Sequence, residues 1–157
     1  MALAISKHAV EQHGKIAAEL GPVLTDLIDL SLQGKQAHWN VTGPFFQSVH
    51  SQMDKIVDDA REWADEVAER IVAVGATASG QVDDVAKVSS LDPLPNGTLG
   101  DQQALALVAQ RVESVAFRAR AAMERLGDID LVSQDLITGI VGGLEKHLWM
   151  LRAQIRG

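Results

Sequence analysis

A helical pattern running without interruption from Phe45 to about Val74 constrains the fold of this chain more than any other feature. Apolar residues recur three and four apart along the stretch, and it contains no proline, which is typical of one long amphipathic helix. At roughly 100° per residue, one face collects Met53, Val57, Ala60, Ala64, Val67 and Ile71. The whole chain is 46% hydrophobic but only 4% aromatic, and its Ala, Leu and Val residues keep helical spacing, so an all-α protein is predicted.

A ridge of acidic side chains carrying one imidazole lies beside that apolar face. One strip about 100° wide holds His50, Asp54, Asp58, Asp65 and Glu69. His50 and Asp54 are one turn apart, as are Asp65 and Glu69, so each pair could hold one metal ion. Between Asp54 and Asp65 the helix rises roughly 16 Å, which metal–ligand bonds of about 2.0–2.2 Å cannot span. One chain alone therefore cannot close such a site on this helix.

A second copy of the chain removes the difficulty. When two such helices pack antiparallel about a two-fold axis near Asp59 and Ala60, His50 lies level with the partner's Glu69, and Asp54 with the partner's Asp65. His38 joins from the end of the preceding helix, after a chain reversal at Gly43-Pro44. The predicted ligands are His38, His50, Asp54, Asp65 and Glu69. Taken singly, such residues are more often packing histidines or solvated acids, but all five meeting one geometry favours a metal site.

The same residues carry a family resemblance. The motif HWNVTG (residues 38–43), with His50, Asp54, Asp65 and Glu69 behind it, resembles the ferroxidase signature of the Dps proteins, the starvation-induced mini-ferritins of bacteria. The similarity continues through ADEVAER (residues 64–70) and DLVSQDL (residues 130–136). It implies a ferritin-like four-helix bundle in which two chains share each site. It also implies that hydrogen peroxide oxidises Fe(II) there and that ferric mineral is stored inside a hollow dodecamer.

Two histidines and three carboxylates suit Fe(II), with Mn, Co and Zn as competitors. Two alternatives stay open: a DNA-compacting protein of the same family, and a plain helical oligomer with a zinc or structural metal site. Dps relatives often bind DNA through a lysine-rich N-terminal arm, but residues 1–14, the expected flexible arm, and the residue that follows offer only Lys7 and Lys15. The net charge is −7, so DNA binding is expected to be weak.

The remaining pattern predicts a single ferritin-like domain over residues 1–157. The first helix is expected over about residues 15–39, with a kink or restart at Gly21-Pro22. A long connection (residues 75–100) carrying a short helix at Val82–Val88 lets the second and third helices run parallel. The last two helices are expected at Asp101–Leu126, capped by Gly127, and at residues 131–154, capped by Asp130. The chain has no cysteine, and neither a signal peptide nor a membrane span is evident, so a cytoplasmic protein is expected.

Several residues outside the ligand set have candidate roles. By resemblance, Asp128 and Asp135 line a three-fold pore that admits iron, and Trp39 lies near the iron site, with helix-end packing as the alternative. Three acids beside the site, Asp58, Glu62 and Glu66, either nucleate mineral or are simply solvated.

Arginines recur every seven residues at Arg111, Arg118 and Arg125. This stripe is interpreted as salt bridges at subunit contacts or a solvated face, with DNA contact as the alternative. His147 and Trp149 are interpreted as packing residues of the last helix, and Glu145 and His147 point to different faces, so they form no second metal site.

Overall fold

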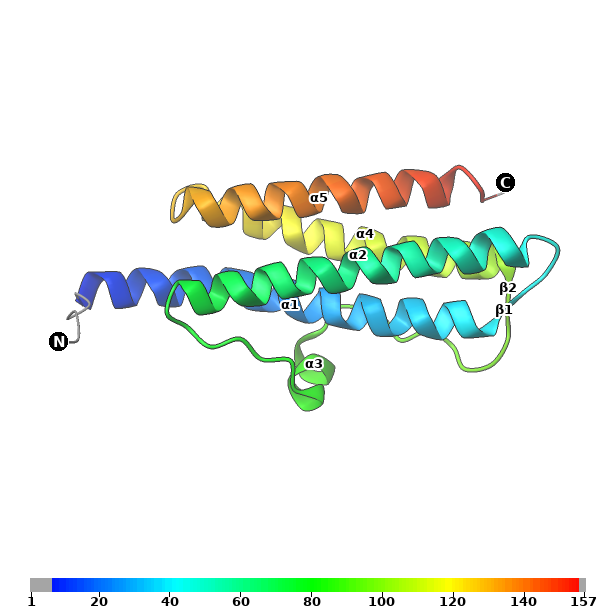
Figure 1. Ribbon diagram of the computed structural model, residues 1–157, viewed down its shortest axis with the longest axis horizontal. Coiled ribbons are helices and arrows are strands. Elements are labelled where there is room, and N and C mark those ends of the chain that lie inside the picture. The colour runs from blue at the N-terminus through cyan, green and yellow to red at the C-terminus, as the bar shows by residue number, and fades with distance from the viewer. Residues whose placement is uncertain (1–6, 156–157) are drawn as a thin grey trace.

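The computed structural model describes residues 7–155 and is built almost wholly of helices. The elements are α1 (Lys7–Asn40), β1 (Val41–Thr42), α2 (Phe46–Ala73), α3 (Val82–Val88), β2 (Leu99–Gly100), α4 (Asp101–Leu126) and α5 (Leu131–Arg152). Four long helices form a bundle and α3 sits on the connection outside it (Figure 1). The predicted all-α four-helix bundle with a short helix in one long crossover is therefore confirmed.

The crossover determines the direction of the helices. The helices α1 and α2 are antiparallel neighbours, and so are α4 and α5 (Figure 1). The connection of residues 74–98 brings the chain back to the opposite end of the bundle, so α2 and α4 run parallel. At that end β1 pairs with β2 in parallel, with Val41 opposite Leu99. This short pairing ties the turn between α1 and α2 to the start of α4.

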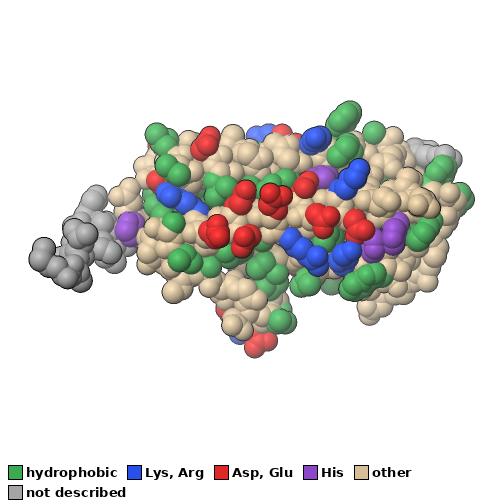
Figure 2. Space-filling view, viewed as in Figure 1, with side chains coloured by type: hydrophobic (Ala, Val, Ile, Leu, Met, Phe, Trp, Pro, Cys, Tyr) green, Lys and Arg blue, Asp and Glu red, His purple; other side chains and the backbone are tan. Residues whose placement is uncertain are grey.

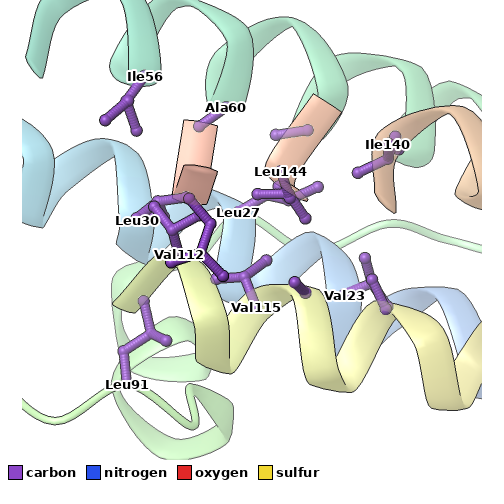
Figure 3. Packing of buried hydrophobic residues seen from close by; sticks show 14 of the residues in the cluster. Val23, Leu27, Leu30, Ile56, Ala60, Leu91, Val112, Val115, Ile140 and Leu144 are labelled. Carbon is purple, nitrogen blue, oxygen red and sulfur yellow. The ribbon is translucent and has the colours of Figure 1, made fainter. Parts of the chain in front are cut away.

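The apolar stripes of the helices meet along the bundle axis (Figure 3). The largest side chains buried there are Leu20, Leu27, Leu30, Met53, Ile56, Ile71, Leu99, Leu105, Leu126, Ile137, Ile140 and Leu144. Each contributes about 1.5–3 kcal/mol of transfer free energy when fully buried. The helices α1 and α2 also approach each other closely at Gly34, where a Cβ would lie 2.6 Å from Cγ2 of Val57. This close contact fixes the spacing of the two helices that carry the predicted ligands.

The first helix differs from the prediction at its start, and it does not restart at its proline. It begins at Lys7 rather than at residue 15, so residues 7–14 of the expected flexible arm are helical, while residues 1–6 lie outside the described part. It also continues through Pro22 as one helix, without a restart. Proline removes one backbone donor, but the neighbouring Leu20, Val23 and Leu24 are buried in the core. Packing on both sides of Pro22 therefore outweighs the loss of one hydrogen bond.

All three arginines of the stripe on α4 have partners inside the chain, but only Arg111 is buried, so a solvated face is wrong for Arg111. A role of the exposed Arg125 at subunit contacts, in solvent or on DNA stays a prediction. Arg111 is buried and donates to carbonyl oxygens of the crossover at 3.1 Å. Arg118 lies 3.1 Å from the Asp26 carboxylate, and Arg125 lies 2.7 Å from that of Glu19, both on α1. The stripe holds the crossover and α1 against α4. The partners are far away in sequence, which is why periodicity alone did not identify them.

Asp26 anchors the crossover from the other side. Its side chain is fully buried and accepts hydrogen bonds from the Ser90 backbone nitrogen at 2.8 Å and the Ser90 hydroxyl at 2.6 Å. Burial raises the pKa of Asp26 above its ordinary value, although the Ser90 hydrogen bonds and the charge of Arg118 act in the opposite direction. A buried carboxylate on α1 and an arginine on α4 thus fix the point where the crossover meets the bundle.

The two caps proposed for the last helices are found where expected. Gly127 is the C-cap of α4, with right-handed backbone angles, and the Asp130 side chain accepts from the Ser133 nitrogen at the start of α5. His147 is buried, as predicted, and its Nε2 also lies 2.5 Å from Oδ2 of Asp59 on α2. Trp149 is 67% exposed, so its assignment as a packing residue is wrong: it lies on the outward face of α5.

No helix among the described residues is both long enough and apolar enough to cross a membrane.

Candidate metal centre

The end of α1 and the first turns of α2 bring three of the five predicted ligands together. His38, His50 and Asp54 each offer one ligand atom, and these atoms lie within 4.8 Å of one another. Among the described side chains this is the only group of three or more histidines and acids with such spacing. His38 is buried, while His50 and Asp54 are partly exposed, so the group sits at the surface of the bundle with one side open.

Each of the two histidines is oriented by the backbone of the other. Nδ1 of His38 lies 3.0 Å from the carbonyl oxygen of His50, and Nδ1 of His50 lies 2.9 Å from the carbonyl oxygen of His38. The rings stack with their centroids 3.6 Å apart. Because a carbonyl can only accept, both Nδ1 atoms must carry the proton, which leaves Nε2 of each ring with a free lone pair. That tautomer is the one an Nε2 metal ligand requires.

Asp54 is held by a cation that sequence reasoning missed. Nζ of Lys35 lies 2.5 Å from Oδ1 of Asp54, and Nδ1 of His38 lies 3.1 Å from the same oxygen. The Lys35 hydrogen bond, helped by the Lys35 charge, lowers the pKa of Asp54 below its ordinary value, although partial burial opposes this. Asp54 is thus ready to bind a cation as a carboxylate. Lys35 precedes His38 by three residues on α1, and that helical spacing is the signal that could have revealed it.

The other two predicted ligands lie elsewhere on the same helix. Asp65 and Glu69 are exposed and do not join the group formed by His38, His50 and Asp54. Acidic side chains form a row along the face over α2, and a group of histidine side chains lies at the right-hand end of this row (Figure 2). One chain therefore assembles part of the ligand set and presents the rest to solvent, as the rise of the helix requires. The two-fold arrangement that would unite the two parts stays a prediction.

The residues with secondary roles are all accessible in the single chain. The proposed nucleation acids Asp58, Glu62 and Glu66, and the proposed pore acids Asp128 and Asp135, are exposed. Trp39 is 69% exposed, so the alternative that it packs the end of its helix is wrong for the isolated chain. It directly follows the predicted ligand His38 in the sequence.

Comparisons with known proteins show that this chain is similar to ferritin-like proteins. Residues 17–157 match the sequence model of the ferritin family, described as a ferritin-like domain. A "DNA protection during starvation protein" of Mycolicibacterium smegmatis is 38% identical over 140 residues, covering 89% of this chain and 76% of the relative.

Solved structures show the same fold. A Dps of Mycobacterium smegmatis in a tetragonal crystal form has a TM-score of 0.91 at 34% identity and covers 100% of this chain and 95% of that chain. A Dps of Microbacterium arborescens, solved in a high iron form, has a TM-score of 0.89 at 34% identity and covers 97% of both chains. The likeness thus extends over the whole bundle, including the end of α1 and the start of α2, which carry His38, His50 and Asp54.

Proposed function

Because the chain belongs to the Dps family of ferritin-like proteins, we propose that it is a mini-ferritin that oxidises Fe(II) and stores the ferric product. One observation carries the proposal: His38, His50 and Asp54 converge within one chain, while Asp65 and Glu69 remain exposed further along α2. Two antiparallel copies of α2 supply the missing carboxylates to each other, which makes two identical sites per dimer.

Iron is the substrate of this site. Hard carboxylate oxygens and neutral imidazole nitrogens suit Fe(II), and the Nδ1-protonated histidines present the nitrogen that would bind it. Asp54 is already held as a carboxylate by Lys35, so Fe(II) must displace an ammonium group rather than a proton. Hydrogen peroxide accepts two electrons, so one peroxide oxidises two Fe(II) ions and both reagents of hydroxyl-radical chemistry are consumed. Exposed acids on α2 then receive the ferric product inside a dodecameric cage.

A DNA-compacting role is the second candidate, and it is favoured by the name of the M. smegmatis relative. Two observations weigh against it here. The net charge is −7, and the arginines of the α4 stripe are paired with groups of the crossover and of α1. Phosphate binding requires several clustered cations. A gel shift with duplex DNA at low and at physiological salt separates the two functions.

The proposed function is tested by following Fe(II) oxidation with peroxide and, separately, with oxygen, alongside native mass measurement. We expect wild-type cages to oxidise Fe(II) faster with peroxide than with oxygen. An Asp54→Ala variant that assembles into cages of the same size should lose this activity. Lys146→Ala, on the exposed part of α5, is the matched control and keeps full activity. Oxidation no faster than in buffer would contradict the proposal and favour a zinc or structural metal site instead.

A further inference from the structure

A buried carboxylate at the start of α4 contacts the turn between α1 and α2, the two helices that carry the predicted ligands. Asp101, the first residue of α4, is only 7% exposed. Its Oδ2 accepts from the Phe45 nitrogen at 2.8 Å, and its Oδ1 accepts from the Gln102 nitrogen at 2.7 Å. Phe45 is the N-cap residue of α2, but its own side chain makes no capping hydrogen bond. Asp101 therefore accepts from the backbone nitrogen of the N-cap residue itself, which is what a Glu or Gln at position N3 does in a capping box.

The turn is shaped around this carboxylate. Gly43 has a φ of +130°, a region that disfavours side chains, and a Cβ added there would lie 2.6 Å from Oδ2 of Asp101. On either side of Gly43, the Val41–Thr42 strand pairs with Leu99–Gly100, and the Phe46 nitrogen donates to the Gly43 carbonyl at 3.1 Å. The reversal between the two long helices is thus fixed by contacts with the start of α4.

The orientation of both histidines depends on that reversal. Each ring donates to the backbone carbonyl of the other, so the end of α1 and the start of α2 must keep their relative position for both hydrogen bonds to survive. The Phe46 ring also lies 4.9 Å from the His50 ring, directly after the residue that Asp101 holds. A shift of the turn therefore moves both imidazoles at once.

We propose that Asp101 is a positioning residue for the His38–His50 pair, acting through the Phe45 backbone. It is not one of the predicted ligands, and its carboxylate accepts from the backbone nitrogens of Phe45 and Gln102. The inference rests on the proposed function only in that the pair must bind a metal ion. Groups that orient metal ligands commonly change metal affinity by about 10-fold to 100-fold when they are removed, and we expect Asp101→Ala to weaken binding by about tenfold.

The test measures Co(II) affinity by titration into the full-length protein, with Co(II) in place of Fe(II) so that no oxidation accompanies binding. It compares variants that all assemble. Asp101→Ala removes both acceptor oxygens, and Asp101→Asn retains one of them, so an intermediate affinity is expected for Asn. The matched control is Asp130→Ala, which removes the N-cap of α5. Asp130 bonds to Arg70, about 30 Å along α2 from His50, so this variant loses stability without reaching the site.

A second measurement is amide hydrogen exchange in the metal-free protein. Residues 38–50 should exchange faster in Asp101→Ala than in Asp130→Ala, because only the former loosens the turn. Equal Co(II) affinity in wild type and Asp101→Ala would overturn the inference and leave the proposed function standing. Failure of the wild type to bind Co(II) would overturn both. Weaker Co(II) binding in both Asp101→Ala and Asp130→Ala would also count against positioning, since it would reflect general loss of stability.

Discussion

The ammonium group of Lys35 is in direct competition with any metal ion for the Asp54 carboxylate. We predict that Lys35→Gln binds Co(II) about twofold to fivefold more tightly, because the ion no longer displaces a partner worth up to about 1 kcal/mol at a partly exposed site. Isothermal titration of the apo-protein measures this. Lys146→Gln, which removes the same charge from an exposed position on α5, is the control and should be unchanged. Weaker binding by Lys35→Gln would mean that the lysine helps to hold the ion.

Asp130 makes the stability of the fold depend on pH in the acidic range. Burial alone would raise its pKa, but hydrogen bonds from Ser133 and Arg70 hold the pKa below its ordinary value. A carboxyl with a lowered folded-state pKa contributes stability that is complete above its ordinary pKa and is lost as the pH falls through the lowered value. We predict that Asp130→Asn, which can still cap the helix, is less stable than wild type at neutral pH and that this difference disappears on strong acidification.

Thermal unfolding of both proteins across that pH range measures the difference. Asp130→Ala, which also loses the cap, should be about 1 kcal/mol less stable than wild type at neutral pH. A stability difference between wild type and Asp130→Asn that did not change with pH would show that the Arg70 and Ser133 contacts do not act on the charged form.

At the level of helices, regular patterns were readable from the sequence and contacts between distant segments were not. The bounds of α3 and α4 follow from the Gly and Pro residues that flank them and from uninterrupted apolar spacing within them. Both helices were predicted with the bounds that are observed. The start of α1 was missed because residues 1–14 were expected to form a loose arm, and Pro22 suggested a kink or restart within the helix. Packing of the helix on both sides of Pro22 decided otherwise, and such packing cannot be read from local propensity.

The same division holds for the metal centre. His38, His50 and Asp54 were brought together correctly because one turn of helix and one chain reversal determine their spacing. The contact of Lys35 could have been predicted from its position on α1 alone. The hydrogen bond from the Phe45 nitrogen to Asp101 could not, because it depends on which end of α4 meets the turn between α1 and α2. That information resides in the long crossover, whose path is set by Asp26, Arg111 and Arg118 rather than by any local pattern.

The contact between α2 and α5 includes the pair Asp59 and His147, whose contribution to the free energy of unfolding can be measured. His147 is buried, its Nε2 lies 2.5 Å from Asp59, and its Nδ1 has no hydrogen-bond partner. We predict that Asp59→Ala destabilises the protein by about 1–3 kcal/mol, because the second ring nitrogen also loses its partner. The double variant with His147→Leu should lose less than the two single changes together.

Denaturant unfolding of the two single variants and the double variant gives the coupling energy. Asp58→Ala, at the neighbouring exposed position, is the control and should change stability by less than about 0.5 kcal/mol. Additive losses would indicate that Asp59 and His147 contribute independently and that the pair does not join α2 to α5.

At the scale of the assembly, the exposed acids at the corner between α4 and α5 are predicted to guide iron into the cage. Asp128→Asn with Asp135→Asn should slow iron uptake while leaving oxidation of iron already bound unchanged, because neither residue is a proposed ligand. Neither is the helix cap, so the variant should assemble. Rapid-mixing measurements separate uptake from oxidation, and equal slowing of both would contradict a pore at this corner.

The last prediction concerns the sharing of each site between two chains. One variant carries His38→Ala, His50→Ala and Asp54→Ala, and the other carries Asp65→Ala and Glu69→Ala. Each variant alone should form inactive cages, since every site needs residues from both groups. After the two are unfolded together and reassembled, a mixed dimer has one site that collects all five substitutions and one site that is intact. With random pairing about half of the dimers are mixed, so activity should return to roughly a quarter of the wild-type value.

The physical basis of this expectation is the separation along α2. The ligand atoms of His38, His50 and Asp54 meet within 4.8 Å, whereas Asp54 and Asp65 are roughly 16 Å apart along one helix. A site enclosed in a single chain cannot be rescued by mixing, because neither variant retains a complete set of ligands. Inactive mixed cages of correct mass, with pairing shown by native mass spectrometry, would therefore exclude the shared site. Recovery near a quarter would indicate that two antiparallel copies of α2 face each other, which is the arrangement that the spacing of these five residues predicts.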